Sequence, residues 1–209
     1  MRKAVIFDVD GVIVFSEKVY QQRRALFFEK NGLSVPQKVQ ERFVGSNAQD
    51  MFEQLIPDDR RKREELLQAY KEFRQHYPID YKEMFNPDIL PTLNGLVNRG
   101  LRLAVASSGP LKNIYRILEV NQIKDYFELV TSGEMFARSK PNPEIYQYTV
   151  SHLELQPSEC LVIEDSALGI EAARRANLSI AALKSHQFVI DQSQATYHID
   201  STKQLLTLV

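Results

Sequence analysis

The sequence has a single cysteine, Cys160, among 209 residues. One cysteine excludes a disulfide framework within the chain and a metal site made of several thiolates. Cys160 opens the apolar run Cys160–Ile163, so we expect a buried strand residue and not a nucleophile. The sequence also lacks an excess of charge of one sign, since 26 Lys and Arg stand against 27 Asp and Glu. This balance argues against non-specific nucleic-acid binding, which needs a basic surface.

Long apolar runs and several known phosphate-binding patterns are absent as well. No stretch is long enough to span a membrane, and the chain opens on a strand without the pattern of a signal peptide, so we expect a cytoplasmic protein. The patterns GxxxxGK[ST] and GxGxxG do not occur, which disfavours P-loop nucleotide triphosphatases and dinucleotide-dependent enzymes. An EF-hand loop is excluded too. Asp8 and Asp10 follow a strand and not a helix, and the further acidic residues that a calcium loop needs are not at the required spacing.

What the chain does have is an unusual first strand. Lys3–Val12 is an apolar run that ends on two carboxylates and a glycine, the pattern of a buried strand. Asp8 and Asp10 are two residues apart, which places both side chains on one side of an extended backbone. Gly11 permits a turn or the close approach of a ligand. An ordinary Asp-Gly turn explains the same residues about equally well. The interpretation as a functional site therefore needs support from residues elsewhere in the chain.

The rest of the chain divides into a helical part and an alternating part. Residues 15–82 contain helix patterns and no strand, so we expect an all-helical insert. Beyond it strands alternate with helices, which predicts an α/β fold with a Rossmann-like parallel sheet and helices on both faces. The further strands are expected at Leu101–Ala106, Phe127–Val130, Cys160–Ile163, Leu178–Leu183 and, as an edge strand before a terminal helix, Tyr197–Ile199.

Polar side chains follow three of these strands, at ends that share one edge of a parallel sheet. Each has a bland interpretation, since a serine or aspartate can cap the next helix and a loop lysine is ordinary. All of them together, in this order, are much harder to explain as caps. The set is Asp8 and Asp10, Ser107 and Ser108, Lys140, and Glu164 and Asp165.

Phosphoryl transfer is the chemistry that suits this set. A carboxylate can attack phosphorus and hold the group as an aspartyl-phosphate. Mg²⁺ is bound in proteins by one or two carboxylates together with substrate phosphate. Serine hydroxyls and free N–H groups at a helix start bind phosphoryl oxygens, and a lysine neutralises their charge.

In order along the chain, these segments closely resemble the motifs of the haloacid dehalogenase (HAD) superfamily, in its branch of phosphatases with a helical cap. Asp8–Val12 is similar to the first motif, Ser107 to the second, Lys140 within Ser-Lys-Pro to the third, and Glu164–Ser166 to the fourth. The likeness covers essentially the whole chain. Four motifs in the right order make it specific.

The resemblance implies two domains and separate catalytic roles for two aspartates of the core. Residues 1–14 and 83–209 would form the core domain, and residues 15–82 a cap that closes over the site and excludes water. Asp8 would be the nucleophile. Asp10 would protonate the leaving oxygen and then activate water.

The same resemblance implies the binding residues. Mg²⁺ would be held by Asp8, by the main-chain carbonyl of Asp10 and by Asp165, with Glu164 nearby or acting through water. Ser107, the amide of Ser108 and Lys140 would hold the phosphoryl group.

The nearest patterns are those of β-phosphoglucomutases and of small sugar-phosphate phosphatases. Three positions depart from the mutase: Phe15 stands where an acidic residue is usual, Tyr20 where a cap histidine is usual, and Ala48 where an arginine grips the distal phosphate. Hydrolysis is therefore the favoured activity. In the cap, Tyr20, Ser46 and Asn47 are candidates to contact the leaving group, and packing or helix capping explains them equally well.

Three functions remain open at this point. The first is a magnesium-dependent phosphatase for a small phosphorylated metabolite such as a sugar phosphate, acting as a monomer. The second is a β-phosphoglucomutase-like isomerase, against which Ala48 speaks. The third is a non-catalytic protein that binds a phosphorylated ligand, against which an intact Asp10 speaks.

Overall fold

One parallel sheet organises the larger part of the molecule. The structure, a computed structural model, describes residues 1–185 and 189–209. Its sheet has the strand order β3-β2-β1-β4-β5-β6, and each neighbouring pair is parallel. The predicted Rossmann-like α/β fold is confirmed. The strands are β1 (Ala4–Phe7), β2 (Arg102–Ser107), β3 (Leu129–Ser132), β4 (Cys160–Glu164), β5 (Ser179–Leu183) and β6 (Tyr197–Ile199).

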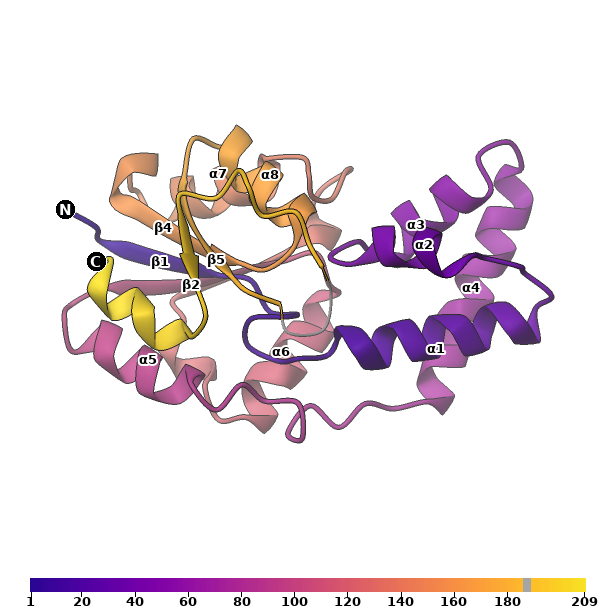
Figure 1. Cartoon of the computed structure of the whole chain (residues 1–209), viewed down its shortest axis with the longest axis horizontal. Coiled ribbons are helices and arrows are strands. Elements are labelled where there is room, and N and C mark those ends of the chain that lie inside the picture. Colours follow the sequence, from indigo (N-terminus) through magenta and orange to yellow (C-terminus); the bar gives the residue numbers. More distant parts are fainter. Residues whose placement is uncertain (186–188) are drawn as a thin grey trace.

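Helices cover both faces of this sheet, α7 and α8 on one and α5 and α6 on the other (Figure 1). The alternation of side chains along β1 explains why its whole run is apolar. Val5 and Phe7 belong to the core cluster that includes α5 and α6, whereas Ala4 and Ile6 belong to the cluster that includes α7 and α8. All four residues are fully buried. Cys160 is likewise buried and unpaired, as expected for a strand cysteine.

The described α-helices lie in the expected helical part of the chain and between the strands that follow it. They are α1 (Glu17–Lys30), α2 (Gln37–Gln40), α3 (Ala48–Leu55), α4 (Arg60–His76), α5 (Ile89–Val97), α6 (Leu111–Val120), α7 (Glu144–His152) and α8 (Ala167–Arg175). Short 3₁₀ helices lie at Glu41–Phe43, Lys124–Tyr126, Gly133–Met135, Pro157–Glu159 and Thr202–Thr207.

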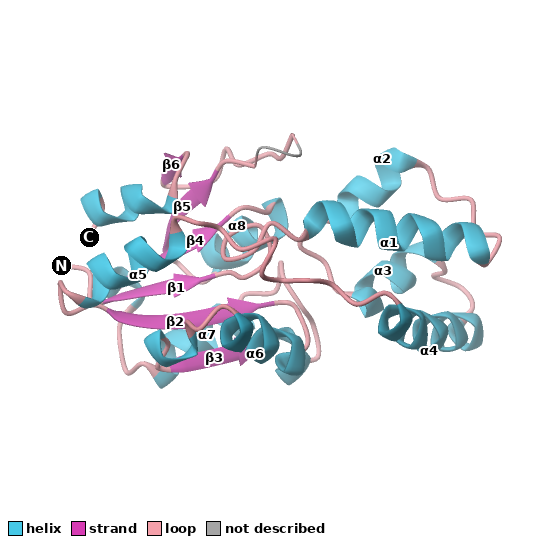
Figure 2. Cartoon of the chain, turned by 90° about the horizontal axis from the view of Figure 1, so that it is seen from below, coloured by secondary structure: helices cyan, strands magenta, loops and turns pink. Residues whose placement is uncertain are grey.

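Helices α1 to α4 stand together at one end of the molecule, beyond the sheet, and we call residues 17–76 the helical lobe (Figure 2). The lobe has its own apolar cluster, in which the ring of Phe27 makes edge contacts with Phe52 at 6.0 Å and with Tyr70 at 4.9 Å between centroids. Aromatic rings favour such edge-to-face packing. Where the chain returns toward the sheet, Ile79 and Tyr81 already belong to a sheet cluster.

Two predicted elements differ from the structure. The strand expected at Phe127–Val130 lies at Leu129–Ser132, because it pairs with β2 in the register Ser107 to Ser132. The terminal helix is a 3₁₀ helix, Thr202–Thr207. The edge strand Tyr197–Ile199 is confirmed as β6.

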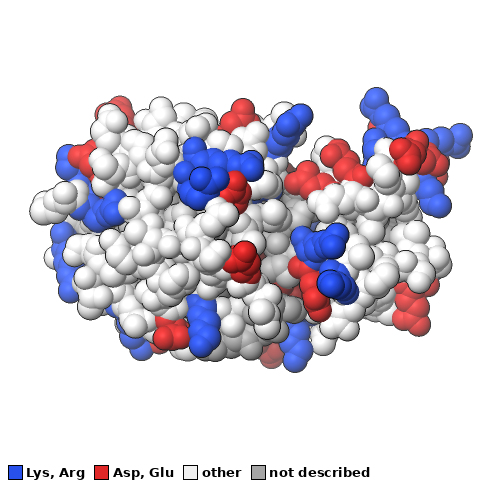
Figure 3. Space-filling view, turned by 45° about the horizontal axis from the view of Figure 1, so that its top comes forward, with Lys and Arg blue, Asp and Glu red and all other residues white. Residues whose placement is uncertain are grey.

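The surface matches the balanced composition. Basic and acidic side chains alternate over the face in Figure 3, with no large continuous area of one sign. Over the described part of the chain, no helix combines the length and apolar character needed to cross a membrane.

Candidate active site

Three neighbouring strands bring polar side chains to one edge of the sheet, as predicted. β1 lies between β2 and β4, with Phe7 opposite Ile163. The main-chain N–H of Asp8 continues this ladder by donating to the Ile163 carbonyl at 3.0 Å. Ser107 and Glu164 are the last residues of β2 and β4. The side chains of Asp8, Ser107 and Glu164 therefore start from adjacent points of the same edge.

Lys140 enters this edge from the loop before α7 and is almost fully buried. Its ammonium group donates to Asp8 Oδ1 at 2.6 Å, to Glu164 Oε1 at 2.7 Å and to the Ala106 carbonyl at 2.9 Å. Burial alone would lower the pKa of Lys140, but the Asp8 and Glu164 carboxylates raise it well above its usual value. Lys140 is thus a permanent cation that orients the Asp8 carboxylate.

An acidic cluster surrounds this lysine. Oxygen atoms of Asp8, Glu164 and Asp165 all lie within 4.8 Å of one another. Burial raises the pKa of Asp8 to about 8, and burial followed by the charges of Glu164 and Asp8 raises the pKa of Asp165 well above its usual value. One lysine does not neutralise three carboxylates. The donor set, all carboxylate oxygen, fits a hard divalent cation such as Mg²⁺.

Gly11 is what allows Asp165 to come so close to the first strand. Its φ is +86°, which favours glycine, and a Cβ built there would lie 1.9 Å from Asp165 Oδ2. The turn after Asp10 is closed by a hydrogen bond from the Gly11 N–H to the Val14 carbonyl at 2.7 Å. The Asp-Gly pair is therefore both a turn and a part of the acidic site.

Glu164 differs from the other carboxylates because both of its oxygens are already in use. Oε1 accepts from Lys140 and from the Tyr146 hydroxyl at 3.1 Å. Oε2 accepts from the Ser166 hydroxyl and from the main-chain N–H groups of Asp165 and Ser166, each at 3.0 Å. Glu164 thereby fixes the turn between β4 and α8 and the lysine beside it.

The close packing of Gly169 against Glu164 gives a stability prediction. A Cβ on Gly169 would lie 1.6 Å from Glu164 Oε1. We expect Gly169→Ala to lower the free energy of unfolding by about 1–3 kcal/mol, because displacement of a fully hydrogen-bonded carboxylate outweighs the gain of about 1 kcal/mol in helix propensity. Denaturant unfolding measures this loss.

Gly95→Ala in α5 is the matched control. There the added Cβ would meet only the end of the Leu206 side chain, at 2.7 Å, which can rotate away. We expect the cost of moving the Leu206 side chain and the gain in helix propensity to cancel to within about 1 kcal/mol. Equal losses in both variants would show that Glu164 is not rigidly held.

Asp10 faces the site from the turn after β1. Its carboxylate accepts a hydrogen bond from the Ser16 hydroxyl. Burial raises the pKa of Asp10, and the hydroxyls of Ser16 and Tyr20 offset part of that rise. The Tyr20 hydroxyl is in turn 3.3 Å from the Tyr81 hydroxyl. A raised pKa favours the protonated form of a carboxyl group, which can donate a proton and then accept one.

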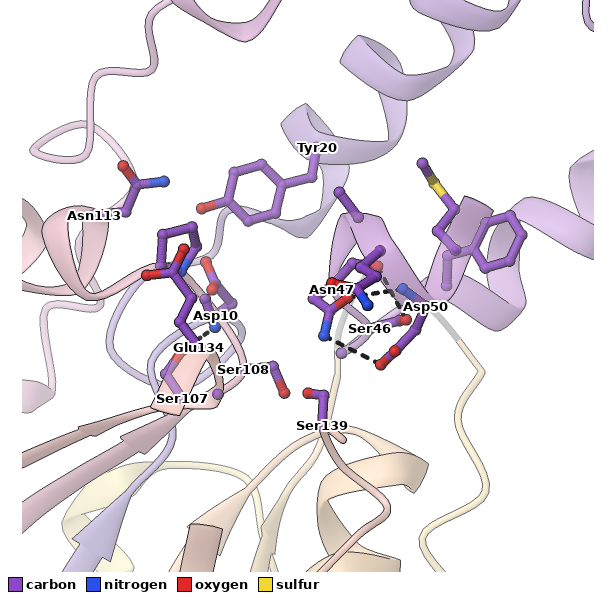
Figure 4. A pocket seen from close by; sticks show the side chains of 18 of the residues that line it. Asp10, Tyr20, Ser46, Asn47, Asp50, Ser107, Ser108, Asn113, Glu134 and Ser139 are labelled. Carbon is purple, nitrogen blue, oxygen red and sulfur yellow. Dashed lines mark hydrogen bonds between the residues drawn. The ribbon is translucent and has the colours of Figure 1, made fainter. Parts of the chain in front are cut away.

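Serine hydroxyls lie along the end of β2 and the loop before Lys140. Ser107 Oγ accepts from the Gly109 N–H at 3.1 Å, which leaves its hydroxyl proton free to donate. The hydroxyls of Ser108 and Ser139 are buried and have no hydrogen-bond partner in the described residues. In Figure 4 they point toward each other across a gap. Donors left in this way fit phosphoryl oxygens.

A cavity of about 410 Å³ lies between this edge and the helical lobe. Its volume is typical of small-molecule sites. Tyr20, Ser46 and Asn47, the predicted lobe residues, all line it. Asn47 also caps α3, since its side chain accepts from the Asp50 N–H at 2.8 Å and donates to the Asp50 carboxylate at 3.1 Å (Figure 4). Capping and contact with a ligand are therefore compatible at Asn47.

The sequence interpretation missed several residues of the site. Ser16, beside Asp10, and Tyr146, beside Glu164, reach it only through the fold. Ser139 lines the cavity next to Lys140. Arg24 and Glu17 form a buried ion pair at 2.6 Å. Their spacing of seven residues, two turns of one helix, was the available signal.

Comparisons with known proteins agree with this geometry. Residues 5–183 match the sequence family described as haloacid dehalogenase-like hydrolase. The chain is 29% identical over 184 residues to a phosphoglycolate phosphatase of Aquifex aeolicus, covering 86% of this chain and 83% of that protein. It is 26% identical over 182 residues to a phosphorylated carbohydrates phosphatase of Thermotoga maritima, with coverage of 84% and 82%.

A solved structure shows the same fold. The β-phosphoglucomutase of Clostridium difficile superimposes with a TM-score of 0.83 at 22% identity, and the match covers 98% of this chain and 93% of that one. Two predictions are thereby confirmed, the family of the chain and its nature as an enzyme. The family match spans most of the chain, from β1 to β5, and so includes all four predicted motifs. The chain belongs to the haloacid dehalogenase-like hydrolases.

Proposed function

We propose that the protein is a magnesium-dependent phosphatase that hydrolyses a small phosphorylated metabolite, a sugar phosphate, through an aspartyl-phosphate on Asp8. One observation supports this proposal most strongly. Asp8 is held by Lys140, lies within an acidic cluster and lines a cavity together with Asp10. The relatives that act on phosphoglycolate and on phosphorylated carbohydrates support the same class of reaction.

The chain's own residues account for both half-reactions. A carboxylate oxygen of Asp8 attacks phosphorus, the bond to the leaving oxygen breaks, and Asp10 gives that oxygen its proton. Asp10 then takes a proton from water as the water oxygen attacks phosphorus, which releases phosphate and restores Asp8. Such an acid–base residue contributes about 10²–10⁴-fold to the rate.

The phosphoryl group would be bound by Ser107, the Ser108 amide and Lys140. Their donors would stay with its oxygens through both steps, which is most of what phosphoryl transfer requires.

Asp8, Asp165 and the main-chain carbonyl of Asp10 would hold Mg²⁺. When bound, the ion supplies positive charge to the phosphoryl oxygens. Glu164 contributes from nearby, since its own oxygens hold Lys140 and the β4–α8 turn.

We further propose that residues 15–82, which include the helical lobe, act as a cap over the site. Gly45, at the tip of a lobe loop, packs directly on Ser166 of the core: a Cβ at Gly45 would lie 2.6 Å from Ser166 Oγ. The lobe therefore already rests on the edge that carries the acidic cluster. Closure of this kind excludes water from the transferring group. Action as a monomer in the cytoplasm stays a prediction.

Phosphate release from a panel of phosphorylated sugars, polyols and nucleotides tests the proposed activity. We expect release with Mg²⁺ and its loss in excess chelator, because one lysine cannot neutralise the three carboxylates and the substrate. Restoration by added Mg²⁺ is the control for the chelator. Release that is indifferent to the chelator would contradict the metal-dependent mechanism.

The mutase remains the second candidate, supported by the structural match to a β-phosphoglucomutase at the level of fold. Ala48 lines the cavity, so a lobe position that carries an arginine in the mutase pattern carries no charge here. A coupled assay for glucose 6-phosphate formed from β-glucose 1-phosphate separates the two activities. Isomer formation without net phosphate release would favour the mutase, and tight binding without either product would favour a binding protein.

A further inference from the structure

Buried side-chain atoms without a hydrogen-bond partner are concentrated in the cavity. Within the described residues there are four such atoms, and every one belongs to a residue that lines this cavity. They are Ser108 Oγ, Ser139 Oγ, Arg23 Nε and Arg24 Nε. Buried polar groups are rarely left unpaired in folded proteins, so a cluster of them in one cavity indicates a ligand that supplies acceptors.

The four atoms form two groups on opposite walls. Ser108 follows β2 and Ser139 precedes Lys140, so their hydroxyls lie on the core wall and suit the phosphoryl group of the proposed reaction. Arg23 and Arg24 are on α1 in the helical lobe. Their N–H groups therefore belong to the wall that faces the leaving group, and the phosphoryl site does not account for them.

Neighbouring groups hold both arginines, Arg24 in a buried position and Arg23 in a half-buried one. Arg24 is 6% exposed and is held by Glu17, itself 7% exposed, at 2.6 Å. The guanidinium of Arg23 lies 5.2 Å from the centre of the Tyr20 ring, and its contact with the Tyr77 carbonyl is long, at 3.5 Å. Arg23 is thus fixed one helical turn from Tyr20, which flanks Asp10, with donors that remain unused.

Charge on the lobe wall favours an anion. Among the described residues, no ion pair involves the lining cations Arg23, Lys71 or Arg74, and only Arg24 is neutralised, by Glu17. The full set of charged lobe residues that line the cavity is Glu17, Arg23, Arg24, Asp50, Lys71 and Arg74. Four cations against two acids leave an excess of positive charge, and guanidinium groups bind the oxygens of carboxylate and phosphate especially well.

We propose that the substrate carries a second oxyanion, a phosphate or a carboxylate, at the end remote from the reacting phosphoryl group, and that Arg23 and Arg24 bind it. The inference rests on the proposed phosphatase function and names its substrate class. Glu17 is a positioning residue that orients Arg24. The cationic anchor is thereby supplied by α1, although Ala48 lacks one.

Pairs of ligands that share the reacting phosphate and differ at their far end test the inference. Glucose 6-phosphate and glucose 1,6-bisphosphate present a hydroxyl and a phosphate on the same ring, and sorbitol 6-phosphate and 6-phosphogluconate present a hydroxyl and a carboxylate on the same open chain of six carbons. Glycerol 3-phosphate and 3-phosphoglycerate repeat the comparison on three. Calorimetric binding to the Asp8→Asn protein, with Mg²⁺ present, measures affinity without turnover, and kcat/KM of the unaltered protein is measured in parallel.

We expect the ligands with a second oxyanion to bind more tightly, and Arg23→Gln to reduce that preference by roughly tenfold to a hundredfold. The double variant Glu17→Gln/Arg24→Gln should reduce it similarly, while it avoids leaving Glu17 charged and unpaired. Arg61→Gln, in an exposed pair on α4, is the control and should leave the preference unchanged. The far group that is preferred, phosphate or carboxylate, names the oxyanion.

The same experiment separates the two proposals. An unaltered preference in Arg23→Gln and in the double variant, or no preference on any carbon skeleton, would overturn the inference. Absence of phosphate release by the unaltered protein, with the arginine-dependent preference intact, would instead overturn the phosphatase function and support the second oxyanion site.

Discussion

Asp8→Asn should abolish magnesium-dependent phosphate release, because an amide cannot replace the carboxylate as nucleophile. Removal of a covalent nucleophile costs up to about 10⁶-fold in rate. The substitution should not unfold the protein. Asn has nearly the same shape, its amide oxygen can still accept from Lys140, and the buried site already favours a neutral group, since burial raises the pKa of Asp8 to about 8.

Phosphate release by purified protein measures the effect, with thermal unfolding to confirm the fold. Asp125→Asn, an exposed surface substitution, is the matched control and should keep full activity. Mass spectrometry of protein quenched with acid during turnover adds a direct readout. The unaltered protein should gain the mass of one phosphoryl group, and Asp8→Asn should not. Release by Asp8→Asn at the rate of the control would mean that the nucleophile lies elsewhere.

Lys140→Met should have the largest effect on stability. It removes the cation that lies between Asp8 and Glu164 and leaves both carboxylates buried without it. Breaking a buried ion pair by removing one partner costs about 3–5 kcal/mol. Phosphate release should also be lost, since the lysine orients Asp8 and would bind the phosphoryl group. Urea unfolding measures the stability, in buffer without Mg²⁺.

The loss should grow as the pH rises. Lys140 lowers the pKa of Asp8, so its removal raises that pKa above about 8, whereas the unfolded carboxyl keeps a value near 4. Between these values the native state holds a proton that the unfolded state releases, and stability falls with increasing pH. The unaltered protein follows the same fall up to about pH 8, so the extra loss of stability in the variant should grow above about pH 8.

Lys124→Met is the control for this variant. Lys124 pairs with Glu119 at 2.8 Å, but both side chains are about half exposed. Exposed pairs contribute little to stability, so the effect should be far smaller and nearly independent of pH. Similar losses of unfolding free energy in the two lysine variants would show that Lys140 does not stabilise the acidic cluster.

The fold was accessible from local patterns. The run before Asp8 is apolar at every position because β1 is buried on both faces, and that demand is visible in consecutive letters. The order of strands and helices then implied a parallel sheet, whose geometry brings the ends of β1, β2 and β4 to one edge. The contacts of Lys140 with Asp8 and Glu164 agree with that expectation.

Element limits were less accessible, and β3 shows why. Its sequence tolerates a strand at either Phe127–Val130 or Leu129–Ser132. The choice depends on hydrogen bonds to β2, in which Ser107 lies opposite Ser132. The sequence of one short strand does not by itself specify its register with a strand that is distant in the chain.

The wall of the cavity that faces the leaving group was only partly accessible, since Tyr20, Ser46 and Asn47 were expected there but the arginines of α1 were not. In a helix as polar as α1, arginines are ordinarily solvated, and only the spacing of Arg24 from Glu17 distinguishes either arginine in the sequence. In the fold Arg24 is buried and Arg23 half-buried, and the Nε atom of each is buried without a hydrogen-bond partner among the described residues. The motifs specify the reacting group because its chemistry demands particular residues at strand ends. The leaving group is specified by side chains that meet across two packed units, and such meetings exist only in the folded molecule.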